Sequence, residues 1–260
     1  MILARIWRGR WALISIFSVA MFFTAWAVIA EGGMVASRFL ISPFGIVKEF
    51  WVLARDGYVG TPLVVHVRAS VIRTFVGFAL SVGLGVPIGL LMGWNRYVSA
   101  VWSPLFAFFR PIPAIALIPL VILWFGIGEF SKVFVIFFTS FLYIALSTAA
   151  AVKEIRVEII KAALSLGARR MQVFLHVVFP ETLPNTVNAI KIGAALSWAL
   201  VVASELVAAQ EGIGFMIMDA ATFYRIPAVY VGILLIGLIG LILEVSIRMF
   251  ENAVVHWSGR

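Results

Sequence analysis

Long apolar stretches constrain the fold of this chain more than any other feature of its sequence. A transmembrane α-helix needs about 20 mostly apolar residues to cross the hydrocarbon core of a bilayer. Six stretches meet or approach this length, at approximately 11–30, 72–94, 101–126, 131–152, 184–208 and 228–248. None shows the sustained alternation of apolar and polar residues that marks a membrane β-barrel. The pattern predicts an all-α polytopic membrane protein with about six transmembrane helices.

The composition indicates a surface that faces lipid. Hydrophobic residues make up 63% of the 260-residue chain and charged residues only 12%, whereas about 25% of a soluble globular protein is charged. One water-soluble core of this size cannot bury so many apolar side chains. The formal net charge of +8 fits Lys and Arg that collect in cytoplasmic loops better than it fits nucleic-acid binding.

Cysteine and histidine usage predicts no metal and no cofactor in this chain. The absence of cysteine excludes a disulfide framework and the zinc and iron–sulfur sites that use thiolate ligands. The three histidines, His66, His176 and His256, are scattered over the sequence and form no pair suited to a metal or a haem.

The first 30 residues have two interpretations. A basic start with Arg5, Arg8 and Arg10, followed by Ala25-Trp26-Ala27, resembles a signal peptide with a cleavage site. However, Trp11 to Ala30 contains no charged residue and has the length of a full span, longer than the 7–15 apolar residues of a signal peptide. We therefore expect an uncleaved first helix.

The distribution of basic residues predicts that both termini are cytoplasmic. With the N-terminus inside, more than half of the 20 Lys and Arg residues fall on the cytoplasmic side, as the positive-inside rule requires. The 209–227 connection on the opposite side carries only Arg225. The first connection is the exception, with Arg38, Lys48, Arg55, Arg68 and Arg73 outside, but longer segments obey the rule less strictly. Within it, Ser42-Pro43 begins a short amphipathic pattern that predicts an interfacial helix.

Glycine residues in one predicted span indicate close helix packing, and proline residues in another indicate a break in the helix. Gly85, Gly89 and Gly93 are spaced by four, which lets helix backbones approach closely in a membrane. The 101–126 stretch contains four prolines, which predict a kinked or broken helix: Pro104, Pro111, Pro113 and Pro119. Such backbone is tolerated in a membrane where it is buried or lines a cavity. We favour a helix that lines a pathway, with ordinary tight packing as the alternative.

The longest polar interruption, 153–180, divides the predicted core of the protein. Its apolar residues recur at helical spacing on either side of Gly167, which predicts two short amphipathic helices. Gly167 suits the left-handed residue that ends the first helix, and Pro180 and Pro184 are expected to stop the second. We expect three parts: 1–68 with the first helix and its connection, a 69–250 core that contains this loop, and a 251–260 cytoplasmic tail.

The same interruption resembles the EAA loop of ABC importer permeases. That motif reads Glu-Ala-Ala, three residues, Gly, nine residues, Ile-x-Leu-Pro. This chain matches its spacing with Lys161, Ala162, Ala163, Gly167, Val177, Phe179 and Pro180. Lys161 in place of Glu is the main departure, because it reverses a charge at the docking surface. By this resemblance Arg169 and Arg170 also belong to the ATPase-coupling segment.

Further segments, in the same order along the chain, resemble the nitrate/sulfonate/taurine branch of these permeases. They are Ser-Val-Ile-Arg-Thr-Phe-Val-Gly-Phe at 70–78, Gly-Val-Pro-Ile-Gly at 85–89, Arg-Pro-Ile-Pro-Ala-Ile-Ala-Leu-Ile-Pro-Leu at 110–120, Trp-Phe-Gly-Ile-Gly at 124–128 and 203–217. The resemblance implies a type I ABC importer permease in the bacterial inner membrane. It also implies a homodimer that works with ATP-binding subunits and a periplasmic substrate-binding protein.

No ATP-binding loop accompanies this resemblance. The chain has no G-x-x-x-x-G-K-[ST] sequence, and Gly126-Ile-Gly128 and Gly212-Ile-Gly214 are too short and lack the lysine. We therefore expect a non-catalytic transport subunit, with ATP and magnesium bound by another chain. The 153–180 segment would then receive the conformational change of that chain.

Charged residues within the spans are the candidates for the translocation pathway, because a charge in lipid is costly. Arg110, followed by Pro111 and Pro113, is placed to attract an anionic solute, with an interfacial or interhelical partner as the alternative. Lys191 is expected to line the inner gate or to extend toward the interface. Glu205, near the outer end of its span, is expected to make structural hydrogen bonds at the outer gate.

The solute itself stays open at this point. The resemblance favours an aliphatic sulfonate, taurine or nitrate, and an aromatic acid or a pyrimidine vitamin precursor is the alternative within the same class. A secondary transporter would need coupling-ion carboxylates in mid-membrane or an inverted repeat. A membrane enzyme subunit would need paired histidines or a carboxylate cluster. Neither feature is clear in the sequence.

Overall fold

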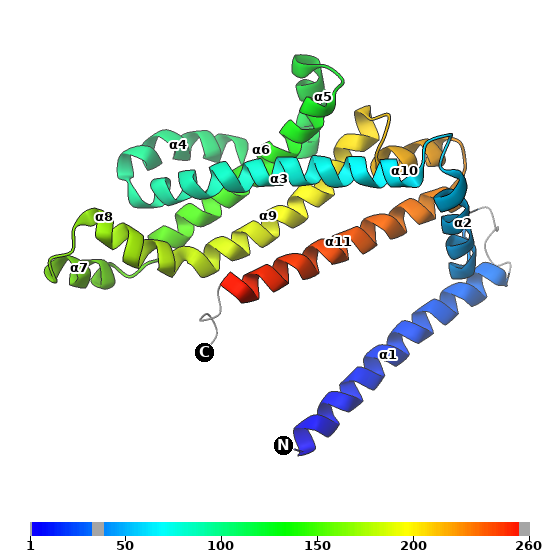
Figure 1. Ribbon diagram of the computed structural model, residues 1–260, viewed down its shortest axis with the longest axis horizontal. Helices are drawn as coiled ribbons and strands as arrows, with labels where there is room; N and C mark the ends of the chain where they lie inside the picture. Colours follow the sequence, from blue (N-terminus) through cyan, green and yellow to red (C-terminus); the bar gives the residue numbers. More distant parts are fainter. Residues whose placement is uncertain (1, 33–38, 255–260) are drawn as a thin grey trace. The chain divides into compact units, whose positions relative to one another are not determined.

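The computed structural model describes residues 2–32 and 39–254, and the regular structure of these residues is helical apart from an isolated bridge between Tyr58 and Thr61. The predicted 255–260 end of the tail, Arg38, His256 and Arg260 lie outside the described residues. The helices (Figure 1) are α1 Ile2–Glu31, α2 Pro43–Asp56, α3 Leu63–Trp94, α4 Arg96–Phe109, α5 Ala114–Phe125, α6 Glu129–Lys153, α7 Val157–Ser165, α8 Arg170–Val173, α9 Phe179–Ala208, α10 Ile213–Thr222 and α11 Ile226–Val254.

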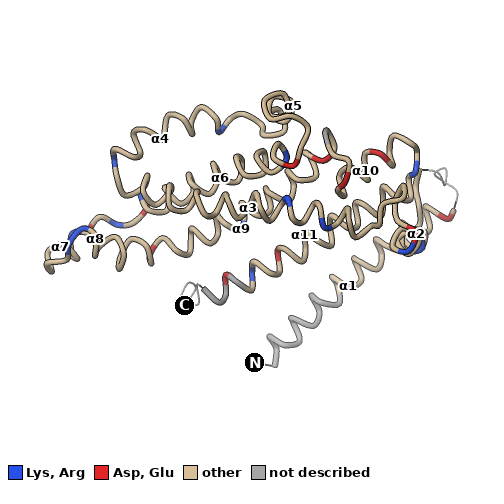
Figure 2. Tube along the Cα trace, turned by 45° about the horizontal axis from the view of Figure 1, so that its top comes forward, with Lys and Arg blue, Asp and Glu red and all other residues tan. Residues whose placement is uncertain are grey.

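The number of spans agrees with the prediction of about six. Five helical segments among the described residues are long and apolar enough to cross a membrane, and the α4–α5 pair makes a sixth if it is counted as one span. Figure 2 shows charge at the two ends of α6 and none along its middle. The chain is therefore a multi-pass membrane protein.

The chain forms two compact units. One contains Met1–Val64 and Met216–Leu234, and the other contains Val65–Phe215 and Leu235–Arg260. In the first unit, Ser42 caps α2 by accepting a hydrogen bond from the Gly45 N–H at 3.3 Å, which confirms the helix predicted there. The Tyr58 hydroxyl donates to Asp219 at 2.7 Å. Burial and this hydrogen bond raise the pKa of Tyr58 above its ordinary value.

In the second unit α6 packs extensively against α9, and α3 also approaches α6 closely. Small residues spaced by four along α3 face α6, and the Ser81 hydroxyl in this row donates to the Phe137 carbonyl at 2.9 Å. A Cβ atom added to Gly89 would stand 2.5 Å from the Ala145 carbonyl oxygen and 2.7 Å from the Thr148 Cβ. The glycine spacing noted in the sequence therefore marks a helix–helix interface in which no side chain fits at Gly89.

Replacing Gly89 by leucine is expected to destabilise the protein, because the added side chain has to push α3 and α6 apart. Overpacking of this kind costs about 1–3 kcal/mol. Gly83 lies on the same helix with nothing within 4 Å of its added Cβ, so Gly83→Leu is the matched control. Unfolding of both variants in detergent measures the effect. Equal stability of the two variants would contradict the interface.

The proline-rich span is broken. α4 and α5 are bent by 99° at the break between them, and Pro113 is the N-cap of α5. Figure 1 shows this change of direction. The prolines at the bend have no N–H to continue the helical hydrogen bonds. α5 then packs on α6 through Ile118, Val121 and Val135. This confirms the kinked or broken helix that the sequence predicts.

Two boundaries differ from the sequence pattern. α3 begins at Leu63, well before the predicted residue 72. The polar residues near this start indicated a loop in the sequence pattern. In the structure, however, His66 and Arg73 lie buried inside the fold. The 209–227 connection contains α10, a short helix that the sequence analysis did not predict. Both differences arise where polar residues find partners from distant parts of the chain.

Candidate functional sites

The 153–180 segment forms the two short helices that its pattern predicts. α7 ends at Ser165, and Gly167 follows with a φ of 87°, in the left-handed region that favours glycine. Its N–H donates to the Leu164 carbonyl at 3.0 Å, and the Ala168 N–H donates to the Ala163 carbonyl at 3.2 Å. The Gln172 side chain accepts from the Arg169 N–H at 2.8 Å at the start of α8. Gly167 therefore makes the turn between the helices, as predicted.

One face of this segment is packed and the other is open. The packed face includes Ile160, Ala163 and Val173, which contact a cluster around Leu90 and Val152. The predicted apolar stripe also included residues that the structure exposes, Leu166 at 90%, Met171 at 63%, Leu175 at 48% and Ala162. The helical spacing predicted the two helices but not which apolar residues meet the core, because apolar residues lie on both faces. Lys161, Arg169 and Arg170 are exposed as well.

Pro180 and Pro184 do not stop the second helix, contrary to the prediction. α8 continues through a π-helical turn, Phe174–Val178, directly into α9. In this turn the Phe179 N–H donates to the Phe174 carbonyl, five residues earlier. Pro180 then occupies the first turn of α9, where a missing N–H costs little. α8, the π-helical turn and α9 are therefore one continuous helical rod.

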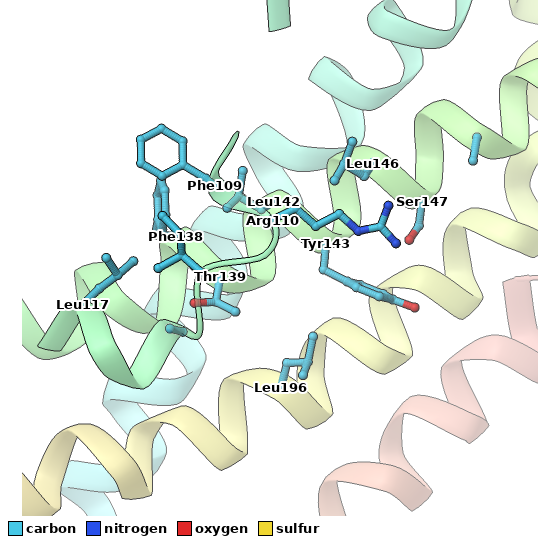
Figure 3. A pocket seen from close by; sticks show the side chains of 13 residues that line it. Phe109, Arg110, Leu117, Phe138, Thr139, Leu142, Tyr143, Leu146, Ser147 and Leu196 are labelled. Carbon is cyan, nitrogen blue, oxygen red and sulfur yellow. The ribbon is translucent and has the colours of Figure 1, made fainter. Parts of the chain in front are cut away.

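Arg110 lines a half-open pocket of about 310 Å³ at the break between α4 and α5 (Figure 3). The polar residues of α6 that line it are spaced by four: Thr139, Tyr143 and Ser147. The apolar walls come from α6 itself and from α4, α5 and α9, and they include Phe109, Leu117, Phe138, Leu142, Leu146 and Leu196. Arg110 is exposed and has no ion-pair partner among the described residues. This volume lies at the small end of ligand pockets.

The other predicted pathway residues lie elsewhere. Pro111 and Pro113 form the bend but do not line the pocket. Lys191 on α9 pairs with Glu251 on α11 at 3.3 Å, with each side chain about one-third exposed. Glu205 is fully buried at the far end of α9. The structure therefore groups Arg110 with none of these residues.

Glu205 is held in a buried polar network that joins α3, α6 and α9. Its carboxylate accepts hydrogen bonds from the Arg73 guanidinium at 2.6 Å, from the Ser70 hydroxyl at 2.8 Å and from the Gly214 N–H at 2.9 Å. Arg73 also donates to both carboxylate oxygens of Glu129, at 2.5 and 2.7 Å. Buried charges with this many partners are stable because each charge is compensated.

The Gly-Ile-Gly sequence after α9 wraps around this carboxylate. A Cβ added to Gly212 would collide with the Glu205 carboxylate, and one added to Gly214 would stand 2.6 Å from the Val202 carbonyl oxygen. The Ile213 N–H donates to the Ser70 hydroxyl at 2.9 Å. These glycines therefore serve a close approach of backbone to a buried acid, and the sequence alone did not indicate this role.

Residues 85–256 match a protein family described as the binding-protein-dependent transport system inner membrane component. This match covers well over half of the chain. The chain belongs to this family. It is an inner-membrane transport permease, as its curated relatives are named. The loop from Lys161 to Pro180, Arg110 and Glu205 all fall within the matched residues.

Individual relatives cover almost all of this permease. The taurine transport system permease protein of Escherichia coli (strain K12) is 34% identical over 97% of this chain and 94% of its own length. The putative aliphatic sulfonates transport permease protein of Bacillus subtilis (strain 168) is 30% identical over 92% and 85%. A solved chain of the inward-facing MetNI methionine ABC transporter is 24% identical, with a TM-score of 0.63 over 74% of this chain and 96% of its own length. This last likeness supports the fold.

The sequence of this permease did not reveal the partner of Glu205 or the residues that line a pocket with Arg110. The stripe of Thr139, Tyr143 and Ser147 at a spacing of four was a visible signal, because hydroxyl groups are uncommon on one face of an apolar span. The sequence pattern marked Arg73 only as a basic residue of the first connection and gave no sign that it pairs with Glu205. Among the described residues, no group of three or more His, Asp or Glu side chains is placed to hold a metal ion.

Proposed function

We propose that this permease is the membrane-spanning subunit of an ATP-driven, binding-protein-dependent importer for a small anionic solute, such as an aliphatic sulfonate, taurine or nitrate. The observation that carries the anionic solute is the guanidinium of Arg110, which lines a pocket in a broken span and has no ion-pair partner among the described residues. The names of the taurine and sulfonate permeases support the same solutes. Two copies of this chain are proposed to work with two ATP-binding subunits and a periplasmic binding protein.

The proposed coupling surface is the open face of the 157–175 segment. Leu166 is 90% exposed at the turn, and Met171, on α8, is 63% exposed. Apolar side chains this exposed indicate a surface that another protein covers. We assign ATPase docking to this face and to its neighbouring motif residues Lys161, Ala162, Ala163, Gly167, Arg169, Arg170 and Pro180.

The continuous rod from α8 into α9 supplies the mechanical link. An ATP-binding subunit that seats the α7–α8 turn in a cleft and then moves would carry α9 with it, because no break separates α8 from α9. α9 contributes Leu196 to the Arg110 pocket and Glu205 to the network at its far end. A displacement of this rod would then change both the Arg110 pocket and the Glu205 network. This is how a rigid element with two positions transmits a conformational change.

Uptake into proteoliposomes tests this proposal. The permease is reconstituted with its ATP-binding subunits and its periplasmic binding protein, and uptake of taurine, butanesulfonate, nitrate, benzoate and a pyrimidine is compared with and without enclosed ATP. We expect ATP-dependent uptake of at least one of the first three anions and none with a non-hydrolysable ATP analogue. Uptake driven by an ion gradient without ATP would instead indicate a secondary transporter.

A further inference from the structure

We propose that two adjoining hollows at the turn between α3 and α4 bind the head group of an anionic phospholipid that carries two phosphates, such as cardiolipin. The site lies on the side of the membrane that the basic residues predict to be cytoplasmic. Three observations support it: cations that meet no carboxylate, an aromatic rim, and an apolar row that leads from the hollows along α4. The site goes beyond the proposed function and does not depend on which solute is transported.

The two hollows share Trp94, which ends α3, and Arg96, which begins α4. The first, of about 470 Å³, is also lined by Ser99 and by Lys153 at the end of α6. The second, of about 610 Å³, is also lined by Arg170 at the start of α8. The Lys153 ammonium donates to the Ser99 hydroxyl at 3.4 Å, which places the end of α6 beside α4. Each hollow therefore has one cation of its own and shares the third.

No acid balances these three cations within the hollows. None of the residues that line either hollow, all of which belong to the described part of the chain, is an aspartate or a glutamate. Arg96, Lys153 and Arg170 are exposed and form no ion pair among the described residues. Figure 2 shows basic positions, in blue, at the start of α4 and around α7 and α8. Basic pockets between membrane helices on the cytoplasmic side suit anionic head groups, and a guanidinium can bind two oxygens of one phosphate.

The surroundings of the hollows indicate a lipid rather than a free anion. Trp94 and Tyr97 line them, and tryptophan and tyrosine gather where the hydrocarbon core of a bilayer meets its head groups. Tyr97 also begins a row of residues on one face of α4, each at least 50% exposed, which continues with Val101, Leu105 and Phe108. Acyl chains can lie along this row and gain from the apolar contact, whereas a soluble phosphate cannot.

The hollows are lined by the packed side of the coupling segment, and the open side does not contribute. Ile160 lines the second hollow and packs in the same cluster as Trp94. Leu166 and Met171, which define the open side, line neither hollow. Arg170 alone belongs both to the site and to the motif residues assigned to ATPase docking. A head group bound in the hollows therefore leaves the open side of the coupling segment free for the ATP-binding subunits.

Native mass spectrometry tests the inference on this permease, both alone and in the complex with its ATP-binding subunits. The protein in a neutral detergent is titrated with cardiolipin, phosphatidylglycerol and phosphatidylcholine, which differ in net negative charge. We expect cardiolipin to bind about fivefold more tightly than phosphatidylglycerol, and phosphatidylcholine to bind most weakly. Equal affinities for cardiolipin and phosphatidylglycerol would overturn the inference. Cardiolipin that binds only in the absence of the ATP-binding subunits would also overturn it, because the cations would then belong to a protein interface.

Inorganic pyrophosphate distinguishes a lipid site from a site for a free anion, because it presents two linked phosphates without acyl chains. It is added to the complex with bound cardiolipin in the same measurement. We expect cardiolipin to stay bound when pyrophosphate is present at the same concentration, since only the lipid gains from the apolar row on α4. Displacement of cardiolipin under these conditions would refute the choice of a lipid.

Variants assign the binding to the hollows. Arg96→Gln and Lys153→Gln are each expected to weaken cardiolipin binding about fivefold, the usual contribution of one basic residue near a membrane surface. Arg156→Gln is the matched control, since Arg156 is exposed just before α7 and lines neither hollow. The side chains of Arg96 and Lys153 are exposed, so both variants are expected to fold. Losses no larger than that of the control in both variants would contradict the site.

Discussion

Replacing Arg73 by methionine is expected to lower the free energy of unfolding by about 3–5 kcal/mol, the usual cost of removing one partner of a buried ion pair. The Glu205 side chain is fully buried and accepts two hydrogen bonds from Arg73 and Ser70. Without the guanidinium, its charge stays buried with only a hydroxyl and the Gly214 N–H as partners. Unfolding of the full chain in mixed micelles, followed by circular dichroism, measures the loss.

A double variant separates the network from simple packing. Arg73→Met with Glu205→Met replaces both charges by apolar groups, and we expect it to be more stable than Arg73→Met alone, because no charge is then left unpaired. Arg248→Met is the control, since the pair of Arg248 with Glu244 is 2.8 Å long but more than half exposed. Such surface pairs contribute at most about 1 kcal/mol. An Arg73→Met variant as stable as this control would refute the structural role of the network.

Replacing Gly167 by proline is expected to abolish ATP-driven uptake while the protein still inserts and folds. Proline holds φ near −65°, whereas Gly167 has a φ of 87° and an N–H that donates to Leu164. The turn between α7 and α8 would have to rearrange, and the exposed Leu166 beside it would lose its place on the proposed docking surface. Uptake and ATP hydrolysis in proteoliposomes are measured together.

The substitution Gly167→Asn distinguishes a turn requirement from a requirement for glycine. Asparagine tolerates the left-handed region better than other residues with a side chain, and an added Cβ at this position meets nothing within 4 Å. We therefore expect Gly167→Asn to keep most of its uptake. Full uptake in the proline variant, with normal stimulation of hydrolysis, would show that the turn does not couple the two activities.

The fold was predictable from the sequence where its signals are local. The apolar spans follow from runs of residues that need no partner to be recognised, and the break between α4 and α5 follows from prolines that cannot donate. The turn at Gly167 follows from the same kind of local reasoning, since the glycine alone permits its φ. The family motif then added an expected partner to a turn that the residues had already indicated.

Local reasoning failed at Pro180, where tertiary structure and a π-helical turn carry the helix past a residue that usually ends one. The apolar stripe that begins in α7 shows which residues are apolar but not which face meets the core. Leu166 is part of that stripe in sequence and is 90% exposed in the structure. Whether such a residue is exposed depends on which distant residues pack beside it, and helical periodicity does not show this.

The sequence by itself determined that this chain is a helical membrane permease with a broken span and a polar hairpin, because each of these features depends on residues that are close together in the sequence. Only the tertiary structure decided what its isolated charges do. Arg73 meets Glu205 across 132 positions of the chain, whereas Arg110 lines a pocket with the hydroxyl residues of α6 and forms no ion pair with a carboxylate among the described residues. The physical reason is that the role of a charged residue in a membrane depends on the groups that pair with it. Only folding brings such distant groups together.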